Sequence, residues 1–129
     1  MPEPTSPRVL VAHQRPPVQR LLRTNLRADG YAALGAASPA TTLGALRAHG
    51  VDALVLDAEL IKGDRPESAD LLRFLLASAM PTLVISWDPT DRLLARSLRD
   101  APFLSRPDDV DQVLRHVREL TAPSVPVAR

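Results

Sequence analysis

The feature of this chain that most constrains its fold is a regular alternation between short apolar runs and amphipathic segments with a helical repeat. Short apolar runs suit buried strands, and apolar residues spaced three and four apart are typical of helices packed on a core. The predicted strands are 8–13, 31–36, 52–57, 81–86 and 101–105. The predicted helices are 16–28, 39–48, 67–79 (after a loop at 62–66), one opened by Asp88-Pro89, and a last one preceded by Pro107-Asp108.

These repeated strand–helix units predict an α/β fold built on a parallel sheet. Strands that are apolar throughout are typical of a parallel sheet covered by helices on both faces. Right-handed crossovers place those helices in two layers. We therefore expect a flavodoxin-like (βα)5 three-layer sandwich, for which the common strand order is 2-1-3-4-5.

The length of the chain, 129 residues, is close to that of one domain. We expect this domain to span residues 8–120. The stretches 1–7 and 121–129 are rich in proline, which interrupts both helices and sheet pairing, so we expect two disordered tails.

The composition argues against several classes of function. The formal net charge of +1 provides no basic surface for nucleic acid, and no helix-turn-helix segment remains once the strand–helix units are assigned. The absence of cysteine excludes disulfides and thiolate metal sites. No apolar run approaches the ~20 residues needed to cross a bilayer, and residues 1–7 lack the apolar core of a signal peptide, so we expect a cytoplasmic protein.

Polar residues stand at the carboxyl ends of four of the predicted strands. In an open parallel sheet, ligands bind beyond these ends where the strand order reverses, which here lies between the first and third strands. The residues delivered there are His13 and Gln14 from the first strand, Asp57 from the third, Ser86 from the fourth and Arg106 from the fifth. No glycine-rich loop of the kind that cradles phosphates follows any of these strands.

Taken in order, four segments resemble the receiver domain of response regulators. They are RVLVAHQRPPVQRLLRTNLRADGY, DALVLDAEL, PTLVISWDPTD and PFLSRP, and the resemblance covers about residues 8–120. It implies that Asp57 is the phospho-accepting residue, Ser86 the conserved hydroxyl and Phe103 the aromatic switch residue. It also implies that Arg106-Pro107 stands where the family has a Lys-Pro pair, whose peptide bond is usually cis in the family.

The chain departs from the family's pattern at the residues that handle metal and phosphate. The family's acidic pair, which helps to hold Mg²⁺ beside the aspartate, is replaced here by His13 and Gln14. Mg²⁺ prefers hard oxygen ligands in octahedral geometry, so we expect weak or absent Mg²⁺ binding and no other cofactor. Arg106 keeps the charge of the lysine but is planar and bulkier. Trp87 follows the hydroxyl residue and is large enough to narrow access to the site.

The sequence leaves two interpretations open for each of these residues. Asp57 either accepts a phosphoryl group or keeps only a structural or switch role. His13 is either an exposed loop residue or, when protonated, a partial substitute for the metal, which would make the site pH-sensitive. Arg106 either contacts a phosphoryl group or forms a fixed ion pair with Asp57. Ser86 either belongs to the switch or only hydrogen-bonds a strand end.

Together, the residues and the resemblance predict an atypical receiver domain, a signalling module rather than an enzyme, with a degraded phosphorylation site. The expected partner is a histidine kinase or a downstream effector. Trp87 and Phe103 indicate a further contact, a homodimer through the fourth helix, fifth strand and fifth helix. Two alternatives stay open. One is a working phospho-accepting receiver of a two-component system, with Asp57 as acceptor, and the other is a small-ligand binding domain that uses the same crevice.

Overall fold

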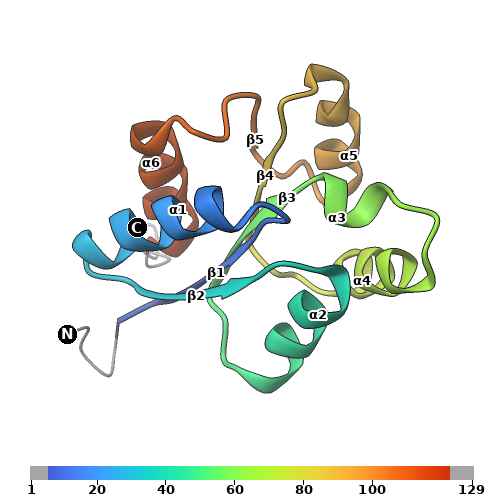
Figure 1. Ribbon diagram of the computed structural model, residues 1–129, viewed down its shortest axis with the longest axis horizontal. Coiled ribbons are helices and arrows are strands. Elements are labelled where there is room, and N and C mark those ends of the chain that lie inside the picture. Colours follow the sequence, from blue (N-terminus) through green and yellow to red (C-terminus); the bar gives the residue numbers. More distant parts are fainter. Residues whose placement is uncertain (1–5, 123–129) are drawn as a thin grey trace, which may run out of the picture.

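The computed structural model describes residues 6–122. At the centre of this part of the chain is a parallel five-stranded sheet (Figure 1). The strands are β1 (Arg8–Ala12), β2 (Ala32–Ala36), β3 (Ala53–Asp57), β4 (Thr82–Ile85) and β5 (Phe103–Leu104). They lie in the order β2-β1-β3-β4-β5. This is the predicted strand order, so the flavodoxin-like fold prediction is confirmed.

Helices cover both faces of this sheet and form the outer two layers (Figure 1). They are α1 (Pro16–Ala28), α2 (Pro39–Ala48), α3 (Glu59–Lys62), α4 (Pro66–Ala77), the 3₁₀ turn η1 (Pro89–Asp91), α5 (Arg92–Ser97) and α6 (Val110–Thr121). Within residues 6–122, no helix is both long and apolar enough to cross a membrane.

The first strand explains why the sheet is covered on both sides. Successive side chains of a strand point to opposite faces, so alternate residues of β1 enter different clusters. Val9 and Val11 pack in a cluster with apolar residues of α1 and α6. Leu10 and Ala12 pack in the other, with apolar residues of α2, α4 and α5. A strand buried on both faces has to be apolar throughout, which accounts for the continuous apolar runs in the sequence.

The last helix is attached to the end of the first one. Arg118 donates two hydrogen bonds to the Asp29 carboxylate, at 3.0 and 2.9 Å. The Tyr31 hydroxyl lies 3.1 Å from that of Thr121, which is the last residue of α6 although the sequence placed it in a tail. Apart from Ser6, Pro7, Thr121 and Ala122, the predicted tails 1–7 and 121–129 lie outside the described residues.

Two segments next to the carboxyl edge of the sheet differ from the expectation. Lys62, predicted to lie in a loop, ends the single turn of α3, which follows β3 almost directly. The helix expected after Asp88-Pro89 is divided into η1 and the short α5. The Asp88 carboxylate accepts a hydrogen bond from the backbone N–H of Thr90 at 2.9 Å, and 3₁₀ turns are frequent at the starts of α-helices.

Two exposed glycines provide a test of the backbone geometry. Gly30 follows α1 with φ of +98°, whereas Gly44 lies inside α2, and an added Cβ would meet nothing within 4 Å at either position. Gly44→Ala should stabilise the protein by about 0.5–1 kcal/mol, because alanine favours the helix. Gly30→Ala should destabilise it by about 1–2 kcal/mol, because a side chain disfavours positive φ. Urea unfolding of both variants measures the difference, and changes of the same sign would contradict the turn geometry.

Candidate functional site

A pocket of about 310 Å³ opens where β1, β3 and β4 end, at the predicted reversal of strand order. Parallel register places the ends of these strands at one edge, so residues far apart in the sequence meet there. The residues that line the pocket are His13, Gln14, Arg15, Asp57, Glu59, Ser86, Trp87, Asp88 and Pro107. Four of the five residues predicted at strand ends are therefore brought together, namely His13, Gln14, Asp57 and Ser86.

Asp57 is the last residue of β3 and is buried, with 4% of its surface exposed. One carboxylate oxygen accepts a hydrogen bond from the backbone N–H of Glu59 at 3.1 Å. The other accepts a longer one from the backbone N–H of Gln14 at 3.4 Å. The segments that follow β1 and β3 thus hold the carboxylate from two sides, and each of its oxygens already has a donor.

His13 lies beside this carboxylate but is not placed as a cation. Its Nδ1 is 3.7 Å from Oδ2 of Asp57 and accepts a hydrogen bond from the backbone N–H of Arg15 at 3.0 Å. An accepting ring nitrogen carries no proton, so the imidazole is neutral in this arrangement, with its proton on Nε2. Burial lowers the pKa of His13 below its ordinary value, and the opposing effect of the Asp57 charge is smaller. His13 is therefore a buried neutral neighbour of Asp57 rather than an exposed loop residue.

Of the two interpretations of Arg106, the fixed ion pair with Asp57 is contradicted by the structure. The Arg106 side chain is 70% exposed, and its Nε lies 3.8 Å from Oδ1 of Asp108. It does not line the pocket, whereas its neighbour Pro107 does. The physical reason is the shortness of β5, which ends at Leu104 and leaves Arg106 in a loop. The Arg106–Pro107 peptide bond is trans, in contrast to the cis bond that the resemblance implied.

The two aromatic candidates occupy different environments. Trp87 lines the pocket and is 54% exposed, so it contributes to the site while much of its surface remains in solvent. Phe103 is buried in β5 against the cluster that includes α4 and α5. The Arg92 guanidinium covers its ring, with 4.9 Å between Cζ and the ring centroid. Phe103 thus packs inward, and a partner that docks on this face would meet Arg92 first.

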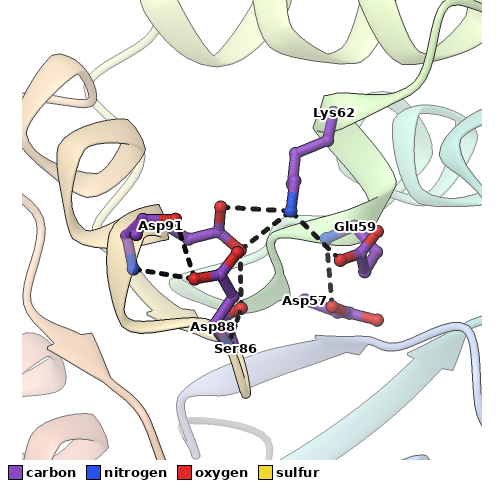
Figure 2. A network of polar contacts seen from close by, with 7 residues as sticks. Asp57, Glu59, Lys62, Ser86, Asp88 and Asp91 are labelled. Atoms are coloured by element: carbon purple, nitrogen blue, oxygen red, sulfur yellow. Dashed lines mark hydrogen bonds and ion pairs between the residues drawn. The ribbon is translucent and has the colours of Figure 1, made fainter.

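A polar network that the sequence interpretation missed lies next to the pocket (Figure 2). The Ser86 hydroxyl donates a hydrogen bond of 2.6 Å to Oδ2 of Asp91. Lys62 Nζ lies 3.2 Å from both carboxylate oxygens of Asp91 and 3.2 Å from Oε1 of Glu59. These hydrogen bonds, above all the one to Asp91, raise the pKa of Lys62 above its ordinary value.

The sequence carried a signal for this network, although a faint one. Lys62 is the only lysine of the chain, and it follows a predicted strand end by the length of one helical turn. Asp91 stands at the same spacing after the next strand end, in the segment that the structure shows as η1. Neighbouring parallel strands bring both positions to one edge of the sheet, and an isolated lysine near such an edge is a candidate partner for a buried carboxylate.

The side chains around Asp57 do not fit a Mg²⁺ ion. Within residues 6–122, no three His, Cys, Asp or Glu residues gather closely enough to hold a metal. The other two carboxylates that line the pocket bind elsewhere, Glu59 to Lys62 and Asp88 to the backbone and hydroxyl of Thr90. Gln14 offers one amide oxygen, and a neutral imidazole is a poor ligand for Mg²⁺. Asp57 alone would leave most of an octahedral shell to water.

Comparison with known proteins assigns the fold. No protein-family model and no curated protein matches this sequence. Among solved structures, the non-phosphorylated HemR receiver domain from Leptospira biflexa is 21% identical, with a TM-score of 0.75 over 95% of this chain and 100% of that one. A response regulator receiver protein from Burkholderia phymatum is 24% identical, with a TM-score of 0.74 and the same coverage. A putative response regulator from Chloroflexus aurantiacus is 20% identical, with a TM-score of 0.77 over 92% of this chain and all of that one. The chain therefore has the fold of response-regulator receiver domains, as the resemblance predicted.

Proposed function

We propose that this chain is an atypical receiver module that signals by binding other proteins, and that Asp57 is not part of an efficient Mg²⁺-dependent phosphorylation site. The environment of Asp57 carries this proposal. The residue lies at the strand end where the resemblance puts the phospho-acceptor. Its neighbours after β1 are a neutral buried His13 and an exposed Gln14, in place of two carboxylates.

The charges in the pocket explain why phosphoryl transfer would be slow. Transfer to a carboxylate brings negatively charged groups together, so efficient enzymes and receivers place cations where that charge develops. Here Arg106 points to Asp108, and Lys62 is already bound to Asp91 and Glu59. Arg15, an exposed residue, is the one side-chain cation among the described residues that line the pocket. Three carboxylates line the same pocket, which leaves the charge balance unfavourable for an incoming phosphoryl donor.

Similar structures include receiver domains of response regulators, which supports a partner of the kind that such modules bind. We therefore propose a histidine kinase or a downstream effector as partner, in the cytoplasm. The face formed by α5, β5 and α6 is the favoured contact surface. Leu93 on α5 is 68% exposed and Trp87 before it is 54% exposed, and they are the two most exposed large apolar side chains among the described residues. The same face is the one through which a homodimer would form.

The first test is chemical phosphorylation with acetyl phosphate. Wild-type protein should show no mass shift in the presence of Mg²⁺, because the pocket lacks ligands for the metal. The double variant His13→Asp with Gln14→Asp should gain a Mg²⁺-dependent mass shift, since it restores carboxylates beside Asp57. Adding Asp57→Asn should abolish that gain, which identifies the modified residue. Rapid Mg²⁺-dependent labelling of wild-type Asp57 would instead favour the alternative of a working phospho-accepting receiver.

The second test concerns the charge of His13. Its pKa, followed by NMR of the imidazole protons, should lie below the ordinary value for histidine and should fall further in Asp57→Asn, because the Asp57 charge opposes the effect of burial. The folded state then binds fewer protons than the unfolded state. The free energy of unfolding should be largest above pH 6.5 and decrease as the pH falls through that value. An unchanged pKa in Asp57→Asn would show that the two side chains do not interact. A His13→Asn variant should lack this step in stability.

A further inference from the structure

We propose that the Ser86 hydroxyl and the Lys62 ammonium form a binding site for a phosphate-class oxyanion, and that the protein occupies this site with its own Asp91 carboxylate. This inference goes beyond the proposed signalling role. It concerns a site on the β4 side of the pocket, next to Asp57 but built from other residues.

The contacts to Asp91 are those that a bound oxyanion would receive. A hydroxyl donor lies 2.6 Å from one carboxylate oxygen, within the range of strong charge-assisted hydrogen bonds. A lysine ammonium lies 3.2 Å from both oxygens (Figure 2). Asp91 is only 5% exposed, so water contributes little to the stabilisation of its charge. A buried carboxylate is costly without such partners, so Ser86 and Lys62 are the groups that make this position tolerable for an anion.

The Ser86 hydroxyl cannot donate a hydrogen bond to a ligand in the pocket while it donates to Asp91. A serine hydroxyl carries one proton, which here is donated to Asp91. Its oxygen also accepts a hydrogen bond from the backbone N–H of Asp88 at 3.0 Å, which fixes its orientation. The 3₁₀ turn η1 holds the acceptor in place, because the backbone N–H of Asp91 donates to the carbonyl of Asp88 at 3.1 Å. Any external anion therefore competes with an acceptor that is attached to the same chain and already positioned.

The occupied site is continuous with the pocket. Ser86 and Glu59 line the pocket, and Glu59 links the two regions. Its side chain binds Lys62, and its backbone N–H donates to Asp57. Removal of the Asp91 carboxylate would leave the hydroxyl and the ammonium with an unfilled position at the pocket edge. Glu59 and Asp88 remain nearby and oppose an anion, so we expect weak binding, with a dissociation constant on the order of 1 mM.

The test is a titration with inorganic phosphate, without Mg²⁺ and without a phosphate donor. Trp87, the only tryptophan of the chain and the neighbour of Ser86, reports binding by fluorescence, and backbone amide shifts of Ser86 and Asp88 report it by NMR. Asp91→Ala should bind phosphate about tenfold more tightly than wild type. Adding Lys62→Gln should remove that gain, because it deletes the ammonium.

Asp70→Ala is the matched control, because it removes the same charge from an exposed residue paired with Arg73 on α4. It should bind phosphate as weakly as wild type. Equal gains in Asp70→Ala and Asp91→Ala would overturn the assignment, and so would an Asp91→Ala variant that binds no better than wild type. Asp91→Ser, whose shorter side chain also vacates the position, should show the same gain and decides the matter if Asp91→Ala does not fold.

The inference and the proposed function can fail separately. Phosphate binding by Asp91→Ala should persist when Asp57→Asn is added, because Asp57 is not among the proposed ligands. Loss of binding in that combination would overturn the assignment of the site to Ser86 and Lys62. Neither result depends on whether Asp57 accepts a phosphoryl group, which the acetyl phosphate experiment measures.

Discussion

The parallel pairing of β3 between β1 and β4 is the constraint on which the rest of this structure depends. Its register aligns Ala12 with Leu56, and Asp57 with Ile85, so the three strands end at nearly the same level. Every residue that follows these ends must then lie at one edge of the sheet. The pocket and the network beside it follow from this alignment, because their side chains come from strand ends and the segments after them, which only the sheet brings together. An antiparallel pairing of the same strands would separate them.

At this edge, the polar side chains mostly satisfy one another. Both oxygens of Asp57 accept backbone N–H groups, and Nδ1 of His13 accepts another. The Ser86 hydroxyl and Lys62 are directed at Asp91. Buried polar groups need partners, and here the chain provides them itself. A site completed internally in this way offers few free donors or acceptors to a ligand.

The sequence predicts the features of this arrangement that depend on neighbouring residues, and it does not predict contacts between residues far apart in the chain. The apolar runs of β1, β3 and β4 determine strands, layers and the position of Asp57, because hydrophobic periodicity is a local signal with a global consequence. The direction of Arg106 was not accessible, because it depends on where β5 stops pairing with β4. The contact between Lys62 and Asp91 joins two segments 29 residues apart, and its geometry depends on short helical turns that carry little periodicity.

The charges of the residues at this edge of the sheet depend on one another. Two carboxylates after β1 would need a metal ion to balance them, whereas a neutral His13 and Gln14 do not. With that negative charge gone, a cation from β5 is no longer required inside the pocket, and Arg106 lies in solvent beside Asp108. Asp91 is the other buried carboxylate near this edge, and it forms an ion pair with Lys62. Carboxylates restored after β1 would be uncompensated unless a metal ion binds with them, and an unpaired buried charge costs several kcal/mol. Under the proposed function, the absence of a second carboxylate beside Asp57 and the exposure of Arg106 are thus two aspects of one arrangement that buries fewer charges.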